Sequence, residues 1–218
     1  MLSQTEENYI KALYYLTSER PGKTKAGTNE LAEHLNIKPA TANNMLKKLK
    51  VKKLINYEKY GKISLTAIGK NQAIEIIRKH RLWETFLYEK LEFTWDEVHE
   101  VAEQLEHIKS NKLIEKLDKL LDYPEFDPHG DAIPNAKGEI IFQIRKTLSQ
   151  IEVGKTCKLI AVKDNSALFL QHVVKLGLGI SSKIKVISRQ EFDAMMEIDV
   201  NGKKSNISHK VAENIFVI

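Results

Sequence analysis

The sequence has one cysteine, Cys157, and no long hydrophobic run. A single thiol excludes an intramolecular disulfide framework and a multi-cysteine zinc site, and it fits a reducing compartment. No stretch approaches the ~18 uninterrupted apolar residues of a transmembrane helix, and the first ten residues lack the basic and apolar parts of a signal peptide. These absences predict a cytoplasmic protein with no membrane partner. The length of 218 residues and the 42% hydrophobic content are sufficient for one large or two small folded domains.

Charge is unevenly distributed along the chain. Lysine and arginine outnumber aspartate and glutamate by 12 to 6 in residues 1–64 and by 13 to 8 in residues 135–218, whereas acidic residues prevail by 15 to 9 in residues 65–134. A basic first segment is typical of proteins that meet a polyanion, and an acidic middle can hold cations. The pattern suggests both properties and establishes neither.

Residues 1–65 show the pattern of a winged helix-turn-helix. Apolar residues at helical spacing predict a first helix over residues 4–18, and a loop with Pro21, Gly22 and Gly27 follows. Thr28 is the expected N-cap of a short helix, and Pro39 is expected in the first turn of the next. Residues 54–66 alternate like a β-hairpin with a basic tip. Two short helices followed by a hairpin predict a DNA-binding domain.

The second helix of this pair is the expected recognition helix. Short polar side chains near its start can reach base edges in a major groove, and lysines farther along it and on the hairpin suit phosphates. A lysine-rich helix face can also be ordinary solvated surface. The predicted DNA contacts are Lys38, Thr41, Asn43, Asn44, Lys47, Lys48, Lys59 and Lys62.

Two helical segments between residues 66 and 134 carry imidazoles and carboxylates. His80 and Glu84 are one turn apart on the first, and a second stripe with offsets 0, 4, 7 and 8 follows on the next. Neutral imidazole and carboxylate are donors for a borderline-to-hard divalent metal. One such pair is more often an exposed ion pair, but two linked segments favour a metal site. The stripe consists of His99, Glu103, Glu106 and His107.

A binuclear hydrolase is the rival interpretation of these donors, because helical bundles also hold catalytic metal pairs. The chain lacks a Glu-x-x-His motif on two further helices, a Ser/His/Asp set and a phosphate-binding glycine loop. A winged-helix protein that is indifferent to metal is a third possibility. The sequence therefore favours a metal sensor that is not an enzyme. The helices have more apolar surface than the winged helix can cover, which predicts a homodimer on a palindromic operator.

The last third of the chain has a different composition. Residues 124–138 are expected to be a loop, with His129 in a structural role, and residues 135–146 a linker. Beyond Thr156, short alternating runs, one helical piece and the turn Asn201-Gly202 predict a small β barrel. The expected class is mainly α with a small β domain. The predicted domains are 1–65 (winged helix), 66–134 (helical, metal-binding and dimerising), and 147–218 (barrel).

Five stretches, in order and spacing, resemble metal-dependent transcriptional regulators of the diphtheria toxin repressor and manganese transport regulator family. They are TEENYIKALYYL, LAEHLNIKPATANNMLKKL, YEKYGKISLT, RKHRL and VHEVAEQLEHI. The tail from about Thr147 resembles the SH3-like (FeoA-type) domain of that family. The resemblance implies a repressor that senses a metal and controls metal-uptake genes.

By position, the resemblance implies two metal sites per subunit, one of His80, Glu84 and His99 and a regulatory one of Glu103, Glu106 and His107. Asn8 lies where relatives supply a methionine or an aspartate, and Lys11 where manganese-type members have a glutamate. A carboxylate at position 103, where iron-type members have cysteine, favours Mn²⁺, with Fe²⁺ as the alternative. Asp164 and His172 are candidate auxiliary ligands from the barrel.

Overall fold

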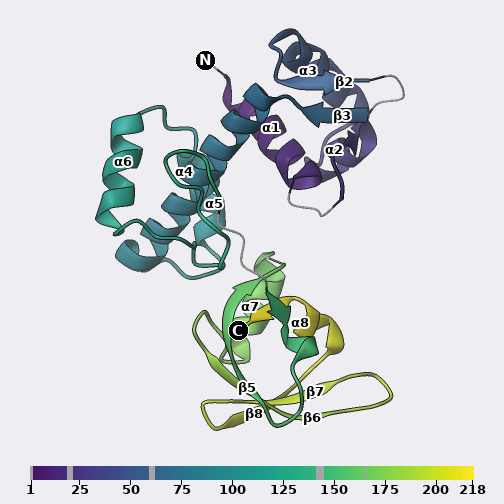
Figure 1. The fold of residues 1–218 in the computed structure, drawn as a ribbon, viewed down its shortest axis with the longest axis vertical. Coiled ribbons are helices and arrows are strands. Elements are labelled where there is room, and N and C mark those ends of the chain that lie inside the picture. Colours follow the sequence, from purple (N-terminus) through teal and green to yellow (C-terminus); the bar gives the residue numbers. More distant parts are fainter. Residues whose placement is uncertain (1, 19–21, 59–61, 141–144, 165) are drawn as a thin grey trace. The chain divides into compact units, whose positions relative to one another are not determined.

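The computed structural model describes residues 2–18, 22–58, 62–140, 145–164 and 166–218 (Figure 1). The chain divides into two compact units. The first comprises Met1–His80, Gln104–Asn111 and Pro134–Glu139, and the second comprises Arg81–Glu103, Lys112–Ile133 and Ile140–Ile218. Among the described helices, none has the length and apolar character that crossing a membrane requires.

The first unit contains a winged helix-turn-helix, as predicted (Figure 1). Its three antiparallel strands are ordered β1-β3-β2. The predicted wing residue Lys59 lies outside the described residues, as does the rest of the hairpin tip, residues 59–61. The elements are α1 (Gln4–Thr17), β1 (Ala26–Gly27), α2 (Thr28–His34), α3 (Pro39–Val51), β2 (Ile55–Tyr57) and β3 (Lys62–Leu65).

Local sequence explains where these helices begin. Ser3 and Glu6 form a capping box at the start of α1. Gly27, in extended conformation, precedes α2, so Thr28 is the first helical residue and the prediction that it is the N-cap was wrong. Pro39 occupies the first turn of α3, where its missing N–H has no helical partner to lose. The predicted inner face of α3 is buried at Ala42, Leu46 and Leu49.

Three helices follow the wing: α4 (Ala67–Leu91), α5 (Val98–Leu105) and α6 (Asn111–Leu120). The prediction that residues 99–107 form one helical stripe was wrong at its end. The N–H of Ile108 donates to the carbonyl of Leu105 at 3.1 Å, which closes a turn after the last helical residue. Glu106 and His107 therefore lie in the turn that follows α5.

The C-terminal part of the second unit is a six-stranded antiparallel sheet ordered β4-β9-β5-β6-β7-β8. The predicted turn Asn201-Gly202 joins β7 to β8, and both residues have positive φ, as a two-residue hairpin requires. The elements are β4 (Lys146–Thr147), a 3₁₀ turn (Leu148–Gln150), β5 (Thr156–Val162), α7 (Ala167–Lys175), β6 (Lys183–Arg189), β7 (Met196–Val200), β8 (Lys203–Ile207), α8 (His209–Glu213) and β9 (Ile215–Val217).

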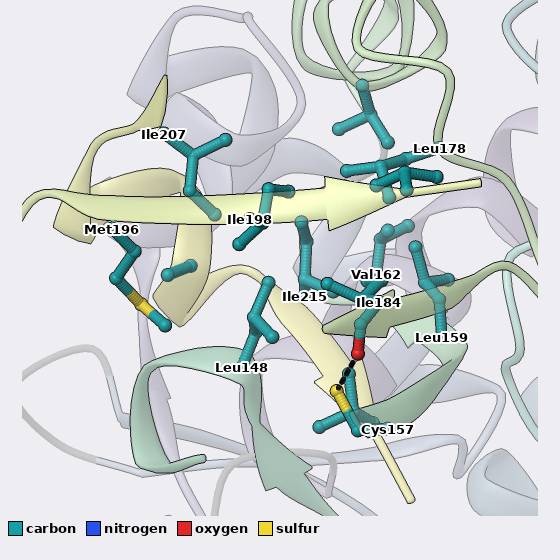
Figure 2. Packing of buried hydrophobic residues seen from close by; sticks show 14 of the residues in the cluster. Leu148, Cys157, Leu159, Val162, Leu178, Ile184, Met196, Ile198, Ile207 and Ile215 are labelled. Carbon is teal, nitrogen blue, oxygen red and sulfur yellow. Dashed lines mark hydrogen bonds between the residues drawn. The ribbon is translucent and has the colours of Figure 1, made fainter. Parts of the chain in front are cut away.

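An apolar cluster fills the inside of this sheet (Figure 2). Leu148, Leu159, Ile184 and Ile215 are fully buried there. Cys157 belongs to the same cluster, and its Sγ donates to the carbonyl oxygen of Ile184 at 3.5 Å, drawn as the dashed line in Figure 2. Burial raises the pKa of the Cys157 thiol to about 11, so this sulfur is a core atom and not an available thiolate.

Candidate metal centre

The first unit gathers polar side chains from α1, α4 and the turn after α5. We call these five residues the Glu106 cluster: Glu7, Lys11, His80, Glu106 and His107. Glu7 and Lys11 are one turn apart on α1 and therefore share a face. All except His107 are less than a tenth exposed as whole residues, and the His107 side chain is 8% exposed. Five ionisable groups in so little solvent require partners of opposite charge or a bound ion.

Glu106 is the centre of this cluster, and it is fully buried. Its Oε2 accepts a hydrogen bond from Lys11 Nζ at 2.7 Å and lies 2.7 Å from His80 Nδ1. Its other oxygen, Oε1, is buried and has no hydrogen-bond partner. A buried carboxylate oxygen without a donor is costly, so Glu106 Oε1 has the position expected of a cation ligand.

His107 has one ring nitrogen close to Glu106 Oε1 and the other close to Glu7. Its Nδ1 lies 2.6 Å from Glu7 Oε2, and a carboxylate can only accept, so the proton is on Nδ1. Lys109 also donates to Glu7. The lone pair of His107 is then on Nε2, which lies 3.8 Å from Glu106 Oε1. Each donor lies about 2 Å from a bound divalent ion, so this separation fits two ligands of one ion.

Asn8 supplies a second orphaned oxygen in the first unit. Its Oδ1 is buried without a hydrogen-bond partner, although it belongs to α1 next to Glu7. The sequence predicted that the amide oxygen of this residue can serve as a ligand. Amide, carboxylate and imidazole are all donor types that a divalent ion such as Mn²⁺ or Fe²⁺ accepts, so Asn8 stays a predicted ligand in addition to Glu106 and His107.

The second unit contains a separate group, which we call the Glu84 cluster: Glu84, His99, Asp127 and His129. Glu84 Oε1 lies 3.0 Å from His99 Nδ1, and Glu84 Oε2 lies 3.6 Å from His129 Nδ1. Ligand atoms of Glu84, Asp127 and His129 all lie within 4.8 Å of one another, and these three residues are buried. They form a second candidate metal site.

The tautomer of His129 follows from its neighbours. Its Nε2 lies 3.0 Å from the carbonyl oxygen of Trp95, which can only accept, so Nε2 carries a proton. The ring also stacks on Trp95, with centroids 5.9 Å apart and planes 16° from parallel. Neutral His129 would therefore present the Nδ1 lone pair towards Glu84, in the orientation of a metal-ligating histidine held by a backbone carbonyl.

Protons balance the charge of the Glu84 cluster when no cation is present. Burial, with the charges of Asp131 and Glu84, raises the pKa of Asp127 to about 8. Burial alone would lower the pKa of His129, but the hydrogen bond and charge of Glu84 raise it to about 9. Both shifts favour the protonated forms of Asp127 and His129, and the guanidinium of Arg81, 3.7 Å from Asp127 Oδ2, adds a fixed positive charge. A divalent cation at this site would compete with these protons.

The loop that carries Asp127 and His129 is fixed by the C-terminal sheet. The N–H of Val162 on β5 donates to the carbonyl of His129 at 3.0 Å. Gly130 has φ +83°, and a Cβ there would lie 2.0 Å from the carbonyl oxygen of Ile160. Arg145 also donates to the carbonyl of Gly130 at 2.5 Å. A glycine is required for this close approach, which places the loop against β5.

Gly130→Ala is therefore expected to displace the loop and weaken the Glu84 cluster. Both the positive φ and the overlap with backbone oppose the added methyl group, so we expect a loss of roughly 2–4 kcal/mol in the free energy of unfolding. Thermal and urea unfolding in chelator measure this loss. Gly154→Ala is the matched control, because Gly154 also has positive φ but open space around its Cβ position. Equal destabilisation by both variants would contradict the packing argument.

The contacts add partners to two of the predicted ligands. His80, which the resemblance places with Glu84 and His99, has its Nδ1 facing Glu106 within the first unit. Glu103 was placed with Glu106 and His107, but it belongs to the second unit, with an oxygen 3.7 Å from His99 Nε2. The full ligand sets remain predictions.

Sequence reasoning did not single out Asp127 and His129 as ligands. They lie in a loop rich in proline and glycine, and loops of that composition are usually solvent-exposed. The available signal was the spacing Asp-Pro-His-Gly-Asp, in which Asp127 Oδ1 accepts the N–H groups of His129 and Asp131. The predicted auxiliary ligand Asp164 accepts the N–H of Ser166 instead, and His172 is exposed on α7.

The predicted recognition helix presents most of its polar residues to solvent. Asn43 is an exception, since its Oδ1 accepts a 2.6 Å hydrogen bond from the Tyr57 hydroxyl on β2. This bond links α3 to the wing and competes with any base contact by the same oxygen. The exposed members of the predicted DNA-contacting set are Lys38, Thr41, Asn44, Lys47, Lys48 and Lys62.

Three family descriptions match successive parts of the chain. Residues 1–63 match the N-terminal DNA-binding domain of iron-dependent repressors, and residues 66–135 match the metal-binding and dimerisation domain of the same proteins. Residues 146–218 match the FeoA domain. The winged helix, the helical segment with His80, Glu84 and Glu106, and the C-terminal sheet correspond to these three parts.

Individual proteins give the same result. An uncharacterised helix-turn-helix transcriptional regulator of Methanocaldococcus jannaschii is 39% identical over 116 residues, which cover 53% of this chain and 91% of that protein. The iron-dependent repressor IdeR of Mycobacterium leprae is 31% identical over 133 residues, 61% of this chain and 56% of its own length. The chain thus spans about half of that curated relative.

Solved structures are similar over nearly the whole chain. A manganese-dependent transcriptional repressor in complex with manganese is 30% identical, with a TM-score of 0.83 over 98% of this chain and 99% of that one. ScaR with bound Zn²⁺ is 33% identical, with a TM-score of 0.74 over 98% of both chains. The chain belongs to the family of metal-dependent DNA-binding repressors that includes IdeR, the diphtheria toxin repressor and the manganese-dependent repressors.

Proposed function

We propose that this protein represses transcription when Mn²⁺ or Fe²⁺ binds to the Glu106 cluster. The observation that carries the proposal is the position of α1 within the first unit. Helix α1 contacts the candidate ligands through Glu7 and Lys11. The same helix contacts the end of the recognition helix α3. A change at the cluster therefore acts on a helix that is attached to the DNA-binding surface.

Glu6 makes the second of these attachments. Its carboxylate accepts a 2.8 Å hydrogen bond from Lys52, the residue that follows α3. This bond, together with the N–H of Ser3, holds the pKa of Glu6 below its usual range, so the carboxylate stays ionised. Helix α1 thus contacts the end of α3 through Glu6 and the cluster through Glu7 and Lys11. As a rigid helix, it can transmit a shift of the cluster to α3.

A bound ion would supply positive charge to two buried oxygen atoms that have no hydrogen-bond partner and to a ring nitrogen. Asn8 Oδ1, Glu106 Oε1 and His107 Nε2 would hold it, and Glu7 would orient His107. Recruiting Asn8 would require α1 to keep one position relative to the turn after α5. The ion can favour the DNA-binding arrangement only by binding it more tightly than the alternative.

The donor chemistry favours Mn²⁺, with Fe²⁺ as the alternative. Both clusters consist of carboxylate, amide and imidazole groups, which suit Mn²⁺ and Fe²⁺. The one thiol of the chain is buried in the C-terminal core with a raised pKa. We further propose that the Glu84 cluster is a second site, so that one subunit binds two ions. The loop that carries Asp127 and His129 is bonded to β5, so metal binding there would act on the second unit.

A homodimer is proposed on the apolar surface of the second unit. Apolar and aromatic side chains of α4, of α6 and of the turn after α6 are exposed in the single chain. An apolar patch of this kind is usual where another subunit binds. A two-fold protein matches a palindromic operator, here proposed to lie before metal-uptake genes in the cytoplasm. The exposed residues are Tyr88, Leu91, Leu113, Leu120 and Tyr123.

The test is DNA binding titrated separately with Mn²⁺ and with Fe²⁺ under anaerobic conditions. We expect a selected operator to be bound in the presence of metal and released by chelator. Light scattering of the free protein should give the mass of two chains of 25.0 kDa. Equal affinity with and without metal would show a winged-helix protein that is indifferent to metal.

Lys47→Ala is expected to weaken operator binding and to reduce its salt dependence. Lys47 is exposed on α3, and each lysine-phosphate contact contributes about one unit to the slope of log K against log salt. Filter binding at four salt concentrations measures this slope. Lys116→Ala, which removes an exposed lysine of α6, is the control and should leave the slope unchanged. A Lys47→Ala slope equal to wild type would exclude a phosphate contact there.

A further inference from the structure

Lys11 places an ammonium group at the oxygen of the central carboxylate. Its Nζ lies 2.7 Å from Glu106 Oε2, with the two side chains 7% and 0% exposed. The stem of Lys11 comes from α1, and Glu106 comes from the turn after α5, 95 positions along the chain. This buried pair connects α1 to the candidate ligand without any metal.

Burial strengthens the attraction between Lys11 and Glu106, and it also strengthens the repulsion between Lys11 and a second cation on Glu106. An ammonium removed from water requires a negative partner, and Glu106 provides it. A divalent ion on Glu106 would lie within a few ångströms of the same ammonium, where poor screening makes repulsion between like charges large. Glu106 therefore cannot hold both cations at full strength.

We propose that Lys11 is a tethered cation that holds Glu106 when no metal is bound and gives it up when a metal binds. Lys11 then determines the metal concentration at which the site fills, because the ammonium at Oε2 repels an ion at Oε1 and the Lys11–Glu106 pair has to weaken as the ion binds. The flexible four-carbon stem of lysine allows the ammonium to move without movement of α1. The same charge opposes a second ion at Oε2, so the Glu106 cluster holds one ion.

This inference rests on the proposed function, since it concerns the affinity of the same site. The change in metal affinity when Lys11 is removed distinguishes this role from a purely structural one. If Lys11 only stabilised the fold, its removal would weaken the protein and leave metal affinity equal or lower. If Lys11 competes with metal, its removal weakens the metal-free protein and strengthens metal binding.

The experiment compares the full-length wild-type chain with Lys11→Met, which keeps the length of the side chain and removes its charge. Mn²⁺ binding is measured by calorimetry and by the electron paramagnetic resonance signal of free Mn²⁺. Thermal unfolding is measured in chelator and in saturating Mn²⁺. We expect roughly tenfold or greater tightening of Mn²⁺ binding, a lower Tm in chelator, and a larger rise of Tm with Mn²⁺.

Lys25→Met is the matched control, because Lys25 forms a 2.8 Å pair with Glu58 in the wing, away from both clusters. It should leave Mn²⁺ affinity unchanged. Unchanged or weaker Mn²⁺ binding by Lys11→Met would overturn the proposal, even with a lower Tm. Absence of Mn²⁺ and Fe²⁺ binding by wild type would instead remove the proposed function, and the role of Lys11 with it.

A measurement on the wild-type chain covers the case in which Lys11→Met does not fold. Reductive methylation followed by peptide mass spectrometry reports how accessible each lysine ammonium is. Lys11 should be protected in chelator and react several-fold faster with Mn²⁺, whereas exposed Lys25 should react equally in both conditions. Equal protection of Lys11 with and without Mn²⁺ would overturn the proposal.

Discussion

Glu106→Gln is expected to abolish metal-dependent DNA binding while leaving the chain folded. The amide oxygen can still accept from Lys11, so the shape of the cluster is retained. The charge that attracts a cation is lost, and the remaining donors, Asn8 and His107, bear no negative charge. Loss of a partner that merely orients a ligand typically costs about 10–100-fold in metal affinity, so loss of a central carboxylate should exceed ~100-fold.

Two measurements check this prediction. Mn²⁺ affinity and operator binding are titrated for Glu106→Gln and for Glu115→Gln, the control that removes an exposed carboxylate of α6. Circular dichroism and thermal unfolding in chelator show whether the variant folds, since weakening the buried pair with Lys11 is expected to cost roughly 1–3 kcal/mol. If the folded variant needs the same Mn²⁺ concentration as wild type to bind DNA, Glu106 is not the switch.

Most of the fold follows from local patterns. Apolar spacing identified α1 and the inner face of α3, and Asn201-Gly202 identified its hairpin, because these features depend on residues close in sequence. The end of α5 was missed, since nothing local distinguishes Leu105 from Glu106 as the last helical residue. The contacts of Glu106 with Lys11 and His80 join residues distant in the sequence, so no local pattern predicts them.

The sequence identifies most of the residues whose side chains could bind a metal, but it does not show which of these side chains contact one another. The pairing of Glu106 with Lys11 and of His107 with Glu7 joins segments about a hundred positions apart, and helical periodicity carries no information on such pairs. His129 was interpreted as structural because its loop has the composition of a surface loop. Its burial depends on Trp95 and on β5, which only the tertiary structure brings to it.

Glu84→Gln is expected to reduce the metal content from two ions per subunit to one. Glu84 is the carboxylate that approaches both His99 and His129, so its neutralisation removes the fixed charge of the second candidate site. The Glu106 cluster, in the other compact unit, keeps its donors. Operator binding should therefore still require metal. Equilibrium dialysis followed by mass-spectrometric metal analysis gives the number of ions per chain.

The control for this variant is Glu89→Gln, which removes an exposed carboxylate from the same helix and should keep two ions. Two ions in Glu84→Gln would mean that Asp127 and His129 do not need Glu84, against the geometry of the cluster. Loss of both ions would mean that the two sites fill as one unit, which contradicts the proposal of one independent ion in each cluster. A single ion with intact metal-dependent DNA binding assigns the switch to the Glu106 cluster, whose residues Glu7 and Lys11 belong to α1.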